Sequence, residues 1–198
     1  MKKKVIISTS REPSPRTRSF VKDISNLAYW LIKINRGKMT FHELVEEAIL
    51  ADSNTLAVVG EMRGNPSIIR VYDLTDVART EKLLHTYSII LKGVALSRET
   101  GNHGVEPQEV NEIIIEPSQG HDEESKALVL ALHQMLNTGV EPPREGKYIK
   151  VNINMAFKLV KFKLFPTGLN VGPVIKYFKV KTPKKLIELG EAAEDSQI

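Results

Sequence analysis

The residues best suited to chemistry lie in a short basic loop near the start of the chain. Residues 10–18 read Ser-Arg-Glu-Pro-Ser-Pro-Arg-Thr-Arg and follow the β-rich run 5–9. Two prolines favour an extended loop. Hydroxyls, guanidinium groups and the free N–H groups of a helix start all donate to phosphate oxygens, so this loop is a candidate phosphate-contact surface. Its candidate residues are Thr9, Ser10, Arg11, Ser14, Arg16, Thr17, Arg18 and Lys22.

A second set of cations lies toward the other end of the chain, where residues 155–165 and 174–181 read as strands. Alternate side chains of a strand share a face, so lysines and apolar residues separate onto opposite faces here. The candidate exposed set is Lys161, Lys163, Lys179 and Lys181, with Tyr177 on the lysine side as a ring on which a base could stack. The expected core set is Phe157, Phe162, Phe165 and Phe178.

The charges divide the chain into three blocks. Residues 1–40 hold ten Lys/Arg against two Asp/Glu, and residues 144–185 hold eleven against one. Between them, residues 99–143 hold one Lys/Arg against nine Asp/Glu. Two basic blocks separated by an acidic one suit a protein that meets a polyanion with one surface, and we expect the two basic sets to fold into one positive surface.

Residue types for catalysis are sparse. The chain has no cysteine, which excludes disulfides, thiolate zinc sites and cysteine nucleophiles. The five histidines fit no metal-ligand spacing, and the acidic residues 122–124 after His121 are explained by a helix dipole. Residues 101–104 lack the lysine of a phosphate-binding P-loop. We therefore expect no enzyme activity, no metal and no cofactor.

The elements that must position these residues follow one plan twice. Strand 5–9 leads into a helix over 19–34, a second helix from a capping box at Thr40 to near residue 52, and strands at 55–61, 67–73 and 87–96. The second half repeats strand, loop, helix and strands. Its expected elements are a strand at 111–116, a loop at 117–121, a helix at 122–138, strands at 148–154, 155–165 and 174–181, and a terminal helix from 182 through 193.

This plan predicts an α/β fold with two similar α/β lobes and mixed sheets flanked by helices. With 198 residues, the chain suits a single domain over 1–198, with lobe one at about 1–98 and lobe two at about 99–198. No run approaches the roughly 18 apolar residues of a membrane span, and the apolar stretch at the start is too short for a signal peptide. We expect a cytoplasmic protein with no membrane partner.

Two segments resemble the Brix family. Residues 7–14 read Ile-Ser-Thr-Ser-Arg-Glu-Pro-Ser and, with 16–24, resemble its opening signature, in which a strand ends in a Thr-Ser-Arg-x-Pro-Ser loop. Residues 63–66, Arg-Gly-Asn-Pro, are similar to a second family turn that leads into an apolar strand. The Gly-Pro-Thr segment of longer eukaryotic members is missing after residue 74, with a faint echo at 172–173. The chain therefore resembles a minimal, stand-alone archaeal member.

The resemblance implies binding of ribosomal RNA or its precursor, a role in ribosome biogenesis through rRNA processing and subunit assembly, and contact with other assembly proteins. It also implies that the two lobes resemble the anticodon-binding domains of some tRNA synthetases. The alternative is a protein-interaction scaffold in a ribonucleoprotein, whose basic faces bind acidic partners.

Overall fold

The computed structural model describes residues 2–116 and 122–189. The first half contributes β1 (Lys4–Thr9), α1 (Pro15–Ser25), β2 (Leu31–Lys33), α2 (Phe41–Leu50), β3 (Ser53–Met62), β4 (Asn65–Asp73), α3 (Val77–Thr80) and β5 (Lys82–Ala95). The second half contributes α4 (Ser97–Thr100), the 3₁₀ turn η1 (Pro107–Glu109), β6 (Val110–Ile115), α5 (Glu123–Leu136), β7 (Lys147–Asn154), β8 (Leu159–Phe165), β9 (Leu169–Lys181) and β10 (Lys185–Glu188).

The strands of the described residues form one ten-stranded mixed sheet in the order β2-β1-β3-β4-β5-β9-β8-β7-β6, with β10 also paired to β5. In the first half β1 is parallel to β3, and β3, β4 and β5 follow as antiparallel neighbours. In the second half β6 is parallel to β7, and β7, β8 and β9 follow as antiparallel neighbours. The antiparallel pairing of β5 with β9 joins the halves into a single sheet. The expected α/β class is confirmed, while the two-lobe division and its likeness to anticodon-binding domains stay predictions.

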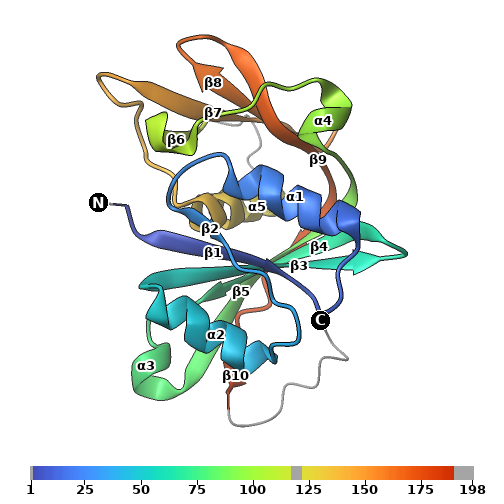
Figure 1. The fold of residues 1–198 in the computed structure, drawn as a ribbon, viewed down its shortest axis with the longest axis vertical. Coiled ribbons are helices and arrows are strands. Elements are labelled where there is room, and N and C mark those ends of the chain that lie inside the picture. Colours follow the sequence, from blue (N-terminus) through green and yellow to red (C-terminus); the bar gives the residue numbers. More distant parts are fainter. Residues whose placement is uncertain (1, 117–121, 190–198) are drawn as a thin grey trace.

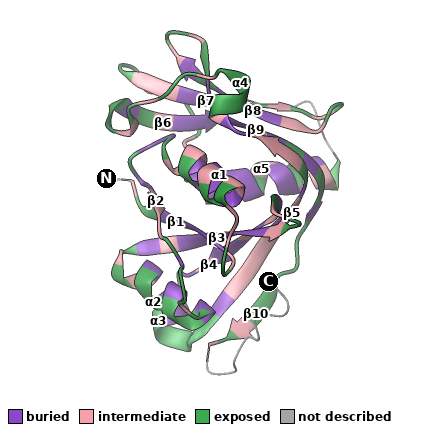
Figure 2. Cartoon of the chain, turned by 45° about the vertical axis from the view of Figure 1, so that its right-hand side comes forward, coloured by how far each residue is buried: buried purple, intermediate pink, exposed green. Residues whose placement is uncertain are grey.

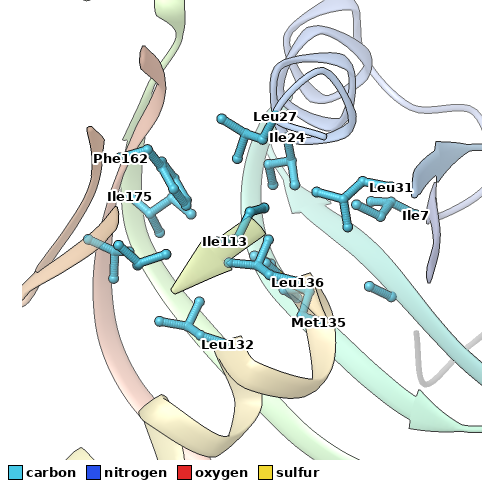
Figure 3. Close-up of a cluster of buried hydrophobic side chains, with 14 of the residues drawn as sticks. Ile7, Ile24, Leu27, Leu31, Ile113, Leu132, Met135, Leu136, Phe162 and Ile175 are labelled. Carbon is cyan, nitrogen blue, oxygen red and sulfur yellow. The ribbon is translucent and has the colours of Figure 1, made fainter. Parts of the chain in front are cut away.

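The sheet curls around α1 and α5, which lie between its two arms (Figures 1 and 2). Apolar side chains of both helices meet those of β1, β3 to β5 and β6 to β9 in one large core. Figure 3 shows this meeting, with Ile24 of α1 and Leu27 of the segment just after it facing Phe162 and Ile175 of the second half. The inner face of the sheet is therefore buried in both halves.

The outer face of the sheet differs between the halves. In the first half α2 covers it, through a smaller core that includes Leu44, Leu56 and Tyr72. That core contains no described residue of β6 to β9. In Figure 1 β7 and β8 form the top of the molecule, and no helix drawn there lies above them. The outer face of the second half is thus left open over the part of the chain that the structure describes.

One expected helix has different bounds, and another is wrong. α1 begins at Pro15 rather than 19, because Ser14 caps it, and it ends at Ser25 rather than 34. The segment 182–189 holds the short strand β10 and no helix, since β5 extends beyond β9 and offers a free edge to it. Residues 190–193 of that expected helix, and the expected loop 117–121 with His121, lie outside the described residues. None of the helices within 2–116 and 122–189 is long and apolar enough to cross a membrane.

The expected strand bounds also shift. β5 begins at Lys82 rather than 87, and β9 begins at Leu169 rather than 174. β8 begins at Leu159 rather than 155, because Lys158 adopts a left-handed φ of 53° and closes the turn from β7. The expected strands near 55–61, 67–73, 111–116 and 148–154, the helix starting at Thr40 and the helix at 122–138 are confirmed to within a few residues.

Candidate nucleic-acid interface

The loop after β1 is held in place by its own serine. The Ser14 hydroxyl accepts a hydrogen bond from the Thr17 amide, which caps α1, and donates to the carbonyl of Gly64 in the β3–β4 turn at 2.9 Å. The Ser14 amide donates to a carboxylate oxygen of Glu61 at 2.9 Å. Burial raises the pKa of Glu61, but hydrogen bonds from Thr17 and Ser14 outweigh it and hold that pKa below its usual value. The loop is thus a fixed scaffold.

Arg16 is engaged in a bond within the protein. Its Nη2 donates to one carboxylate oxygen of Glu99 and to the Val94 carbonyl, each at 2.9 Å, and its Nη1 donates to the other carboxylate oxygen of Glu99. The hydrogen bond to Glu99 raises the pKa of Arg16 and lowers the pKa of Glu99. Arg16 belongs to α1, which lies on the inner side of the curled sheet, so its bond to Glu99 ties α1 to α4 on that side.

The other loop residues divide by exposure. Thr9 and Thr17 are buried, so their hydroxyls are not available to a ligand, which corrects the expectation from the sequence. Ser10 and Ser14 are half-buried. Arg11, Arg18 and Lys22 are exposed, and Arg11 lies 3.5 Å from the Met39 carbonyl.

The strand β8 carries lysines on one face and apolar residues on the other, as expected. Lys161 and Lys163 are exposed, whereas Phe162 and Leu164 are buried in the inner core. Across the sheet, Lys163 pairs with Lys150 of β7 on one side and with Asn170 of β9 on the other. Directly paired residues project to the same face, so these side chains share the outer face.

A β-bulge in β9 overturns the expected positions of two aromatic residues. Leu91 pairs with Tyr177 and Ile90 with Lys179, which leaves Phe178 as an extra residue. One extra residue reverses the alternation beyond it. Tyr177 is therefore buried in the inner core, where its hydroxyl donates to the Met155 sulfur, and Phe178 is 60% exposed. Burial, with the nearby Glu124 and Asp122 charges, raises the pKa of Tyr177. A stacking role for Tyr177 is excluded, and so is a core role for Phe178.

Phe157 is also exposed, in the turn before β8, and corrects the expected core set. Phe165 is half-buried, and its ring stacks on Tyr148 on the outer face. Of the four phenylalanines expected in the core, Phe162 alone is fully buried.

The same bulge brings the lysines of β9 onto the outer face. Val180 pairs with Ile89 and both are buried in the inner core, so their neighbours Lys179 and Lys181 project outward. Lys176 pairs with Leu159, two residues from Lys161, and projects outward as well. We call this surface the lysine face, and it consists of Lys150, Lys161, Lys163, Lys176, Lys179 and Lys181.

Most charges of the lysine face are not neutralised by the protein. Lys150 lies 3.6 Å from a carboxylate oxygen of Glu116. Among the described residues, no carboxylate forms an ion pair with the other five lysines. Arg16 lies on the opposite side of the sheet, so it drops out of the common surface expected from the sequence.

Sequence reasoning missed Lys150 and Lys176, together with Asn152 and Asn170 beside them. Lys150 and Asn152 alternate along strand 148–154, a pattern that could have placed them on one face. The pairing of that strand with β8 could not be read from the sequence.

No family model matches the chain. It is 35% identical over 188 residues to a probable Brix domain-containing ribosomal biogenesis protein of Aeropyrum pernix, covering 93% of this chain and 98% of that one. It is 27% identical over 175 residues to a protein of the same description from Sulfurisphaera tokodaii, covering 87% and 90%.

The solved structures agree. The crystal structure of the probable ribosomal biogenesis protein from Aeropyrum pernix K1 matches with a TM-score of 0.71 at 31% identity, covering 93% of this chain and 99% of that chain. The structure of Mil, an archaeal Imp4-like protein, matches with a TM-score of 0.60 at 21% identity, covering 90% and 99%, and shows the likeness of the fold. The chain therefore belongs to the Brix domain-containing ribosomal biogenesis proteins known from archaea.

Proposed function

We propose that this protein assists ribosome biogenesis by binding ribosomal RNA or its precursor through the lysine face. The names of its relatives support the biological role. The observation that carries the molecular role is a sheet face with six lysines, five of them without an ion-pair partner in the described chain, and no helix over it.

The counter-ions of RNA provide the driving force for this binding. Each lysine that approaches a phosphate releases condensed cations, and that release drives binding in a salt-dependent way. From Asn170 to Lys179 the strand β9 spans ten residues, and the nine steps between them, at roughly 3.3 Å each, give about 30 Å. The lysine face is therefore long enough to follow several phosphates of one strand.

This role requires no bond-making. The protein would hold rRNA in a folded state during assembly, and the exposed loop residues Arg11, Arg18 and Lys22 would add contacts to RNA or to other assembly proteins. We further propose that the two halves are lobes of one domain, similar to anticodon-binding domains, and that the protein is not an enzyme and acts in the cytoplasm.

The test is filter binding of a labelled ribosomal RNA transcript over a series of salt concentrations. Lys161→Ala/Lys163→Ala removes two phosphate contacts and should reduce the slope of log affinity against log salt by about 1.4 to 1.8. The matched control, Arg79→Ala/Lys126→Ala, removes two exposed cations that pair with Asp76 and Glu123. It should leave the slope unchanged.

An equal slope for the lysine variant and the wild type would exclude the lysine face as the RNA contact. A protein scaffold gives a different result in a second experiment. Pull-down of a partner that survives nuclease treatment, together with an unchanged slope, would favour the scaffold.

A further inference from the structure

A pocket of about 350 Å³ opens on the lysine face. Its lining combines ammonium groups, carboxamides, one carboxylate and one aromatic ring. The residues are Glu116, Lys150, Asn152, Lys161, Lys163, Phe165 and Asn170. Its volume lies at the lower end of the roughly 300–1,000 Å³ of small-molecule sites.

The aromatic side of the pocket is fixed by its neighbours. The ring of Phe165 stacks on Tyr148 with centroids 5.2 Å apart and planes 12° apart. The Lys150 ammonium lies 4.9 Å from the Phe165 centroid, in a cation–π contact. The Phe165 ring and the Lys150 ammonium group are thus positioned by contacts within the protein, without a ligand.

The polar side is also oriented. The Asn152 Nδ2 group donates to a carboxylate oxygen of Glu116 at 2.5 Å. That bond turns Oδ1 of Asn152 away from Glu116, as an acceptor for a ligand. Asn170 pairs across the strands with Lys163, so its carboxamide lies beside an ammonium group.

We propose that this pocket binds one unpaired nucleotide of an RNA strand. Lys161 and Lys163 bind its phosphate, and the carboxamides of Asn152 and Asn170 hydrogen-bond to the edge of its base. This inference rests on the proposed function and deepens it. It assigns single-stranded or looped RNA as the ligand class of the lysine face.

The requirement for an unpaired base follows from the mixture of groups. Ammonium groups alone would suffice for phosphates of any RNA, whether duplex or single-stranded. Carboxamides read base edges, which Watson–Crick pairs occupy and which the deep, narrow major groove of a duplex hides. A pocket that holds both kinds of group fits a base turned out of the stack.

In the test, the full chain is titrated with the four nucleoside 5′-monophosphates and with ribose 5-phosphate, and binding is measured by NMR of the backbone amides of β7, β8 and β9. At least one nucleotide should bind more tightly than ribose 5-phosphate. Asn152→Ala/Asn170→Ala should weaken that nucleotide about tenfold, as expected for the loss of two hydrogen bonds, and leave ribose 5-phosphate unchanged. The control is Asn35→Ala, at an exposed position between β2 and α2. It should change neither the affinity for the nucleotide nor the affinity for ribose 5-phosphate.

Equal binding of nucleotides and ribose 5-phosphate would reduce the pocket to a plain anion site and overturn the inference. So would a duplex that competes for the RNA site as well as a single strand of the same sequence. Neither result contradicts the proposed function if Lys161→Ala/Lys163→Ala still lowers the slope of log RNA affinity against log salt. An unchanged slope in that variant would contradict the proposed function itself.

Discussion

At the scale of single residues, His85 shows how packing sets a charge state. Its ring lies against Tyr72 with centroids 4.9 Å apart, and one ring nitrogen is 2.8 Å from the Ser88 hydroxyl. Burial, aided by the positive charge of Arg70, lowers the pKa of His85 from 6.5 to about 4. The folded protein therefore keeps this imidazole neutral through a range in which the unfolded chain protonates it.

This shift predicts lower stability in mild acid. Between pH 6.5 and about 4 the unfolded state binds a proton that the folded state does not, so the free energy of unfolding falls as pH falls through that window. His85→Gln removes this titrating group, so the loss of unfolding free energy between neutral and acid pH should be smaller by on the order of 1–2 kcal/mol. This value is lower than the full pKa shift implies, because the ring is partly exposed to solvent. Urea unfolding at about pH 7 and pH 4.5 measures it.

The exposed His103 provides the control. His103→Gln should keep the pH dependence of the wild type. If His85→Gln and the wild type lose equal stability between the two pH values, the folded state does not hold His85 neutral.

Residue types and local spacing predicted the exposed lysines of β8, but not the positions of Tyr177 and Phe178 or the ion pair of Arg16. Lys161 and Lys163 follow from alternation alone, which is a local property. Tyr177 and Phe178 exchanged roles because a bulge depends on the pairing of β9 with β5, which no local pattern records. Arg16 pairs with Glu99, which lies 83 positions further along the chain, so no local pattern could have indicated the pair.

At the scale of elements, the contact of β9 with the segment after α1 depends on one glycine. Gly172 has a φ of 62°, a left-handed conformation that favours glycine. A Cβ at this position would lie 2.6 Å from Cδ2 of Leu27 in the segment after α1. The Gly-Pro dipeptide at 172–173 thus lets a strand of the second half approach the helix side of the first.

Gly172→Ala should therefore destabilise the protein by about 2–4 kcal/mol, through backbone strain and a clash together. Gly168→Ala is the matched control, since its φ is 72° but nothing lies within 4 Å of the added Cβ. It should cost only the strain, about 1–2 kcal/mol. Chemical denaturation of both variants measures the difference.

Truncation of Leu27 separates the cost of the clash from the cost of the backbone strain. In Leu27→Ala the clash partner is gone, so adding Gly172→Ala should cost no more than Gly168→Ala does. An equal cost for Gly172→Ala and Gly168→Ala in the wild-type background would show that Leu27 yields without penalty.

Helices with local signals were predicted well, and those without them were not. The capping box of Thr40 and Glu43 and the acidic start of α5 both mark helix starts in the structure. The apolar spacing over 19–34 continues past the end of α1, because the segment after it packs Leu27 and Leu31 into the same core without being helical. β10 needs the free edge of β5, which appears only in the folded sheet.

At the scale of the whole molecule, the inner core is common to both halves. α1 and α5 lie in the same apolar cluster, with strands of both halves around them. The indole Nε1 of Trp30, in the first half, donates to the carbonyl of Leu136, in the second, at 2.8 Å. Separating the halves would expose this inner core to water, and the smaller core under α2 would remain within the first half alone.

The shared core predicts that the chain unfolds in one cooperative step. Trp30, the single tryptophan, is 1% exposed and reports the contact between the halves. A Trp30→Phe/Phe165→Trp variant moves the probe to the second half. Urea transitions followed by fluorescence of each protein and by far-ultraviolet circular dichroism should coincide within error. Separate midpoints, with the halves dividing near residue 98, would mean that each lobe holds enough of the core to fold alone.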